Sequence, residues 1–152
     1  MGTDSEESYE FWTDGPRVIV AGVDGSTTSM RAGSYAAGLA RRQNARLVIV
    51  YVAGRSSLAD MAPGGALVTE QTMDEIADDL RREITDGAAR LGVRAEFIVT
   101  HGDPLSELAR IADEVHADGV VVGVSEKIGH RLVGSLAVRL VRIGHWPVTV
   151  VP

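Results

Sequence analysis

The sequence predicts an α/β protein: a single domain built on an open five-stranded parallel sheet of order 3-2-1-4-5, with helices on both faces. Five short apolar runs alternate with four longer segments of helical patterning, which is the order of parallel strands joined by right-handed helical crossovers. Three of the runs are almost wholly apolar, as in strands that helices cover on both sides. The chain has 152 residues, a length that suits one hydrophobic core.

The first strand–helix–strand unit is predicted from two apolar runs and the segment between them. Residues 17–23 (RVIVAGV) and 46–52 (RLVIVYV) contain few polar side chains, which indicates strands buried on both faces. Asp24 and Ser26 follow the first run, and both residue types cap helices. Segment 27–43 carries alanine and glycine at helical spacing, so we expect a helix that packs closely on the sheet.

The middle of the chain predicts a long loop, two helices and a strand with one solvated face. Residues 54–68 include the run Pro-Gly-Gly, a helix breaker, so we expect an irregular loop. A capping-box pattern then opens a helix over 72–91. Segment 93–100 alternates apolar and polar residues, which is typical of a half-solvated edge strand. Gly-Asp-Pro at its end predicts a capped helix over 104–116.

The last two strands decide the order of the sheet. Residues 119–123 (GVVVG) are a third apolar run and belong in its centre. A helix is expected over 134–143, and the final run 147–151 (PVTVV) begins with a proline, which strands tolerate at an edge or at their start. With 93–100 at the other edge, the order is 3-2-1-4-5. The switch point, where such sheets bind ligands, then lies between the first and fourth strands.

Composition and charge exclude several classes of function. The net charge of −6 disfavours binding to nucleic acid, which needs a basic surface. The chain has no cysteine and its histidines lack a metal-binding spacing, so no metal is expected. No apolar run is long enough to cross a membrane. Residues 1–16 are acidic and unpatterned, so we expect a disordered tail rather than an export signal, a domain over 17–152 and a cytoplasmic protein.

Two places near the switch point have the chemistry to hold a ligand. Asp24, at the end of the first strand, can accept hydrogen bonds from ribose hydroxyls, or it simply caps the next helix. Gly134 and Ser135 open the last helix, where backbone N–H groups suit a phosphate, with plain capping as the alternative. Residues 123–127 begin like a nucleophile elbow, but a lysine replaces its last glycine. No Walker or dinucleotide motif follows the first strand, and we expect no catalytic centre and no enzyme.

Several segments of the chain resemble the universal stress protein family. They are GVDGSTTS at 22–29, GDPLSELARIADEVHADGVVVG at 102–123, the Gly134-Ser135 helix start and WPVTVV at 146–151. They follow one another in the family's order, and the resemblance as a whole covers residues 17–152. The resemblance implies the five-stranded α/β fold and a role in the stress response. Many members of the family bind ATP, and members typically form dimers, often through the last strand.

The ATP-binding motif of that family is glycine, two residues, glycine, nine residues, then glycine and Ser or Thr. This chain matches it at Gly123 and at Gly134-Ser135. Glu126 stands in place of the second glycine, and seven residues separate it from Gly134. The glutamate adds a charge beside the phosphates, and like charges at about 4 Å repel by roughly 1 to 4 kcal/mol. Basic residues of the same loop, from Lys127 onward, either offset this repulsion or form a solvated face.

By analogy with the ATP-binding members, an adenine nucleotide would lie at the switch point. The analogy places its adenosine end against Gly22, Asp24 and Val52, and its phosphate end against Gly123, Ser125, Gly134, Ser135 and Leu136. The resemblance also implies a homodimer through 147–151, an apolar strand whose free edge would otherwise be exposed. Two functions remain open. One is a stress-response module that binds ATP or a related adenine nucleotide, and the other is a stress protein without nucleotide that acts through dimerisation and protein partners.

Overall fold

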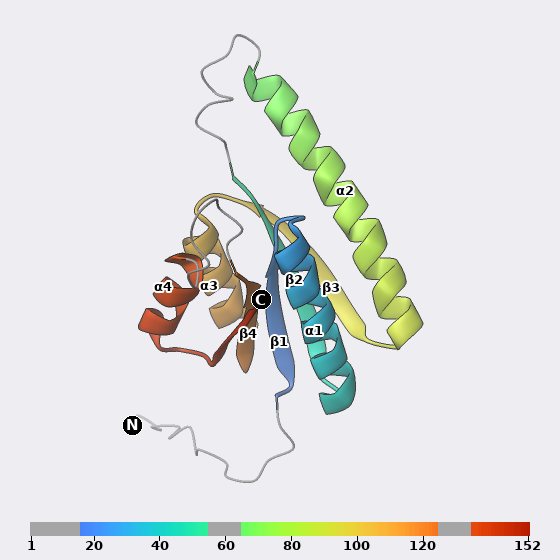
Figure 1. The fold of residues 1–152 in the computed structure, drawn as a ribbon, viewed down its shortest axis with the longest axis vertical. Helices are drawn as coiled ribbons and strands as arrows, with labels where there is room; N and C mark the ends of the chain where they lie inside the picture. The colour runs from blue at the N-terminus through green and yellow to red at the C-terminus, as the bar shows by residue number, and fades with distance from the viewer. Residues whose placement is uncertain (1–15, 55–64, 125–134) are drawn as a thin grey trace, which may run out of the picture.

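The protein is a parallel β-sheet between two layers of helices (Figure 1). This computed structural model describes residues 16–54, 65–124 and 135–152, so the tail expected over 1–16 lies almost entirely outside the described residues. In chain order the elements are β1 (Val18–Val23), α1 (Thr27–Gln43), β2 (Arg46–Ala53), α2 (Gly65–Leu91), β3 (Arg94–His101), α3 (Pro104–Glu114), β4 (Gly119–Gly123), α4 (Ser135–Ile143) and β5 (Val148–Val151).

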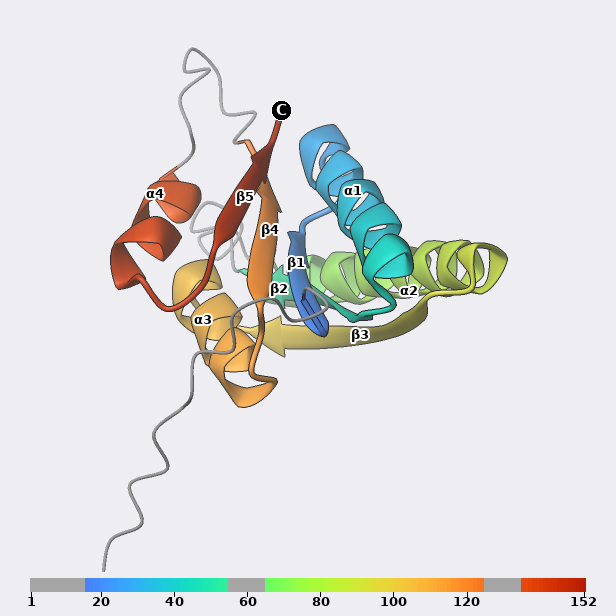
Figure 2. The same ribbon diagram turned by 90° about the horizontal axis from the view of Figure 1, so that it is seen from below.

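The sheet confirms the fold class and the strand order that the sequence predicts. The described strands pair in parallel in the order β3-β2-β1-β4-β5. Helices α1 and α2 cover one face, and α3 and α4 cover the other (Figure 2). The edge strands β3 and β5 contain no fully buried residue, whereas the centre of β1, β2 and β4 is buried. The continuous apolar runs therefore mark the strands that both layers cover.

Each face of the sheet has its own hydrophobic cluster, because successive side chains of a strand point to opposite faces. In β1, Ile19, Ala21 and Val23 join the cluster under α1 and α2. Val20 joins the cluster under α3 and α4, which also contains Trp146. The ends of β1 and β4 therefore lie between the α1/α2 layer and the α3/α4 layer.

The start of α2 differs from the expectation. The sequence predicts an irregular segment over 54–68 and a helix that begins at about 72, but α2 begins at Gly65, and residues 55–64 lie outside the described residues. The sequence from Ala66 to Gln71 consists largely of good helix formers, and their propensity outweighs the neighbouring Pro-Gly-Gly breaker. A capping-box pattern inside a helix marks no boundary, so the signal at Thr72 was misleading.

The remaining boundaries agree with the expectation to within two residues. Helix α3, for example, ends at Glu114 rather than 116, since His116 adopts a left-handed conformation with φ of 51°, which a helix cannot continue. Such one- or two-residue differences are usual at helix ends.

Candidate functional site

The candidate site lies at the edge of the sheet where the carboxyl ends of β1 and β4 meet. These strands are direct neighbours, with Ala21 paired to Val121. Asp24 follows β1, and Gly123 is the last residue of β4. The two residues that the sequence places at the switch point are therefore at the ends of adjacent parallel strands.

The turn after β1 is held by hydrogen bonds among its own serines and Asp24. The Ser26 N–H donates to Asp24 Oδ1 at 2.9 Å, and the Asp24 N–H donates to Ser29 Oγ at 3.1 Å. Ser26 is the N-cap of α1 and accepts the Ser29 N–H at 3.2 Å. Gly25 permits the reversal with φ of 85°, a value that glycine adopts without steric cost. The carboxylate is thus held in one orientation at the mouth of the switch point.

The hydrogen bonds of this turn keep Asp24 ionised. Asp24 is exposed, yet neighbouring protein atoms remove part of its solvation, which raises its pKa. Hydrogen bonds with Ser26 and Ser29 outweigh that effect, so the pKa of Asp24 lies below its usual value. Burial raises the pKa of the nearby Tyr51, and the charge of Asp24 raises it further. At neutral pH the site therefore presents a fixed carboxylate, which suits acceptance of hydrogen bonds from hydroxyl groups, while the Tyr51 phenol is neutral and buried.

Gly123 is required by the packing of β4 against α1. A Cβ at this position would lie 2.6 Å from the backbone carbon of Thr28 and 2.8 Å from the backbone nitrogen of Ser29, closer than any real contact. The Thr28 hydroxyl also donates to the carbonyl oxygen of Val124 at 2.7 Å. The resemblance suggests a phosphate as the reason for this glycine, but the first turn of α1 already accounts for it.

Sequence reasoning missed the part that Thr28 has in this contact. It lies in the segment GVDGSTTS, but nothing in its spacing shows that its hydroxyl reaches a residue 96 positions later in the chain. This hydrogen bond can be predicted only once β1 and β4 are known to be neighbouring strands. The contact ties the start of α1 to the chain that leaves β4.

The other candidate residues of the described chain lie on the α3/α4 side of the sheet. Val52 and Leu136 are half-buried and pack against the cluster under those helices. A Cβ at Gly22 would lie 3.3 Å from Leu108 of α3. Ser135 is the first residue of α4. Ser125 and Gly134 lie outside the described residues. The structure therefore describes the whole adenosine end of the expected site, but only Gly123, Ser135 and Leu136 of its phosphate end.

The structure also bears on metals and membranes. Within residues 16–54, 65–124 and 135–152, no group of three or more His, Asp or Glu side chains could hold a metal ion. No helix in those ranges has the length and apolar character needed to cross a membrane.

Comparison with protein families gives one clear match. The model of the universal stress protein family matches residues 16–152. The universal stress protein MJ0531 of Methanocaldococcus jannaschii is 30% identical over 137 residues, which are 88% of this chain and 80% of that protein. The universal stress protein YxiE of Bacillus subtilis is 31% identical over 146 residues, 89% of this chain and 97% of that protein.

Solved structures agree with this match. A universal stress protein crystallised in complex with cAMP is 30% identical, with a TM-score of 0.69, over 90% of this chain and 97% of that one. The universal stress protein UspA of Lactobacillus plantarum, at 22% identity and a TM-score of 0.73 over 89% of this chain and 97% of that one, shares the fold. The chain belongs to the universal stress protein family.

Proposed function

We propose that this universal stress protein is a regulatory module of the stress response that binds an adenine nucleotide at the switch point between β1 and β4. The observation that carries the proposal is the oriented, ionised carboxylate of Asp24 at the edge where those strands end. A relative with 30% identity over most of both chains was crystallised with cAMP, which supports an adenine nucleotide as the ligand.

The adenosine part of the ligand would meet Asp24, Gly22 and Val52. Asp24 Oδ1 already accepts the Ser26 N–H, and because a carboxylate has about four acceptor positions, it can also accept a ribose hydroxyl. A carboxylate at the end of a β-strand is a common acceptor for that group in α/β nucleotide sites. The apolar side chain of Val52, half-buried at the end of β2, offers a surface for the base.

The phosphate part of the ligand would meet the chain between β4 and α4, whose sequence contains Glu126. We propose that this glutamate favours nucleotides with a single phosphate, cAMP or AMP, over ATP. Each additional phosphate charge near the carboxylate costs roughly 1 to 4 kcal/mol at about 4 Å. The N-terminus of α4 at Ser135 has the backbone N–H groups and the helix dipole that suit one phosphate.

Calorimetric titration of the purified, nucleotide-free protein with cAMP, AMP and ATP tests the proposal. We expect binding of the two monophosphates to be tighter than that of ATP, and Asp24→Ala to weaken all three. Glu126→Gly should raise the affinity for ATP more than that for cAMP. An absence of binding at millimolar nucleotide would contradict the proposal, and equal effects of Glu126→Gly on both ligands would contradict the charge argument.

We also propose that the protein forms a homodimer through β5. Val120 donates its N–H to the carbonyl of Pro147, and Val124 donates to that of Val151, each at 2.9 Å. Groups that face the neighbour alternate along a parallel strand, so the N–H and C=O of Val150 face the free edge. A second copy paired at this edge would satisfy them.

A substitution at Val150 tests the dimer. Val150→Pro removes the outward N–H and leaves the hydrogen bonds to β4, so sedimentation should show monomers while circular dichroism shows a folded protein. A dimer that persists in this variant would contradict an interface at β5. If nucleotide binding fails and the dimer is found, the alternative function, a stress protein that acts through dimerisation and protein partners, is favoured.

We propose, finally, that the protein is a cytoplasmic binding module and not an enzyme. The lowered pKa of Asp24 and its hydrogen bond to Ser26 make it a weak general base, since an effective base has a pKa near the working pH. Incubation with ATP should release phosphate no faster than a buffer blank. Release that disappears in Asp24→Asn would contradict this, and cell fractionation tests the location.

A further inference from the structure

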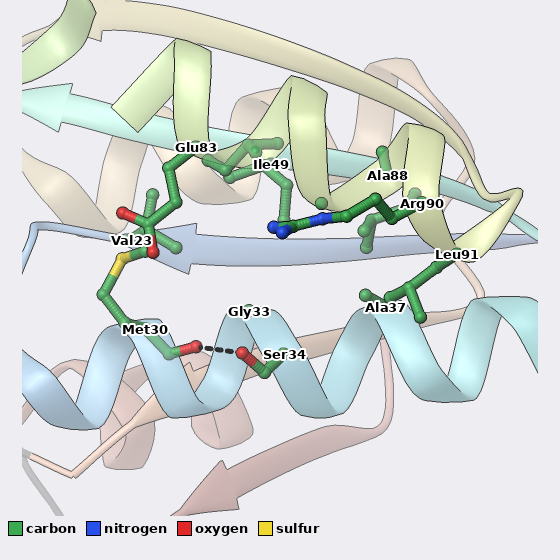
Figure 3. Close-up of a pocket in the computed structure, with 13 residues that line it drawn as sticks. Val23, Met30, Gly33, Ser34, Ala37, Ile49, Glu83, Ala88, Arg90 and Leu91 are labelled. Atoms are coloured by element: carbon green, nitrogen blue, oxygen red, sulfur yellow. Dashed lines mark hydrogen bonds between the residues drawn. The ribbon is translucent and has the colours of Figure 1, made fainter. Parts of the chain in front are cut away.

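A cavity of about 460 Å³ lies between α1, α2 and the sheet, on the face away from α3 and α4 (Figure 3). Its walls are mainly apolar and come from the sheet and from the two helices that cover this face. They include Val23 and Ile49 of the sheet, Met30 and Ala37 of α1, and Ile84 and Leu91 of α2. None of the residues expected to bind nucleotide lines it. The cavity is therefore distinct from the switch point, and its volume is in the range of small-molecule sites.

Small residues on both helices line the hollow. Gly33 and Ala37 of α1 line one side, and Gly87 and Ala88 of α2 line the other. A Cβ added at Gly87 would meet no atom within 4 Å. Glycine inside a helix is destabilising relative to alanine, and here no close approach of α1 requires it. The missing side chain leaves space in the cavity instead.

One cationic side chain extends into the cavity. In Figure 3 the Arg90 side chain runs from α2 into the space between the helices. Arg90 has no ion pair or hydrogen bond with another described residue. A guanidinium is built to bind a carboxylate through two parallel hydrogen bonds. Arg90 is exposed to solvent, so the site offers an apolar hollow and one solvent-accessible cation that can bind an anion.

The second charged residue of the lining gives the chamber a direction. Glu83 lies two turns before Arg90 on α2, is exposed to solvent, and in the view of Figure 3 its carboxylate lies at the end of the cavity that Met30 lines. An anionic headgroup would be repelled at that end and attracted at the Arg90 end. The Met30 thioether at the Glu83 end can adapt to the shape of an alkyl chain. A ligand with one carboxylate and an apolar tail fits in only one orientation.

We propose that this cavity binds a medium-chain fatty acid, with its carboxylate on Arg90 and its alkyl chain along the apolar walls toward Met30. The occupant carries a single negative charge, because Glu83 disfavours a second anionic group at the far end. Burial of the alkyl chain supplies the affinity, and the Arg90 guanidinium selects a carboxylate over a neutral headgroup.

Decanoate, at concentrations where it is monomeric, is the probe for a titration of the full-length protein carrying ¹³C-methyl methionine. Met30 is the methionine among the lining residues, so its methyl signal should shift and saturate at one ligand per chain. Gly87→Leu fills the hollow and should abolish the shift, whereas the matched control Gly87→Ala should still bind. Leucine and alanine both favour helix over glycine, so both variants should fold.

The role of Arg90 is tested by changing the ligand together with the protein. Arg90→Gln should weaken decanoate by roughly tenfold, the effect of losing a charged hydrogen-bonded partner, and leave the affinity for the neutral 1-decanol unchanged. Equal losses for both ligands, binding that survives Gly87→Leu, or an unmoved Met30 signal would each overturn the proposal. Titration of Gly87→Leu with cAMP should match the wild type, which keeps this test separate from that of the nucleotide site.

Discussion

The two faces of the sheet are packed in different ways. Large buried side chains fill the face under α3 and α4, including Leu108, Ile111, Leu140 and Trp146. On the other face α1 lies directly on the strands through three fully buried alanines, Ala32, Ala36 and Ala40. Under α2, however, a cavity of about 460 Å³ remains. Small residues bring α1 close to the sheet, and small residues on both helices line the space that remains between α1 and α2.

The largest expected effect comes from truncating one large side chain on each face. Leu140→Ala should lower the free energy of unfolding by about 3 kcal/mol, because Leu140 is 0% exposed and its removal opens a new cavity. Ile84→Ala should cost no more than about half of that, since Ile84 already borders a cavity. Urea unfolding measures both. Equal losses would mean that the space under α2 is closed in solution.

The next effect tests the close contact between the end of β4 and the first turn of α1. Gly123→Ala should destabilise the protein by about 2 kcal/mol, since the new methyl group would meet the backbone of Thr28, which cannot move aside without shifting α1. Gly22→Ala is the matched control: its neighbour is the flexible side chain of Leu108 at 3.3 Å, and the cost should stay below about 1 kcal/mol. The reverse ranking would contradict the close packing of β4 on α1.

A smaller effect, of opposite sign, is expected on the loosely packed face. Gly87→Ala should raise the free energy of unfolding by about 1 kcal/mol, because alanine favours the helix and nothing lies within 4 Å of the new methyl group. The midpoint of thermal unfolding reports the change. A loss of stability would show that α1 and α2 touch at this point.

The smallest effect concerns Asp24, at the edge of the sheet where β1 and β4 end. The pKa of Asp24 is lower in the folded state than the ordinary value of 3.8, so its ionisation stabilises the fold above that pH. The contribution is lost as the pH falls through the folded pKa. Unfolding of wild type and Asp24→Asn should therefore differ at pH 7 and converge in acid. A difference that is constant with pH would show that the effect is not due to ionisation.

Much of this protein could be predicted from the sequence because the signals are local or periodic. Continuous apolar runs mark the strands that both layers cover, alternation marks β3, and the proline at 147 marks an edge. These patterns determine the strand order and hence the position of the switch point. The segments from 22–29 to 146–151 likewise determine the family. These features depend on which face of a helix or strand is buried, and the spacing of apolar residues along the sequence indicates that face directly.

Other features were decided only by the tertiary structure. The need for glycine at 123 arises from the backbone of Thr28, a residue far away in the sequence. The cavity depends on the distance between α1 and α2, which neither helix specifies alone. Helical spacing predicts which side chains face inward, but it does not predict whether the inward faces of two helices meet. Contact distances of that kind follow from the packing of the whole domain, and so they appear only in three dimensions.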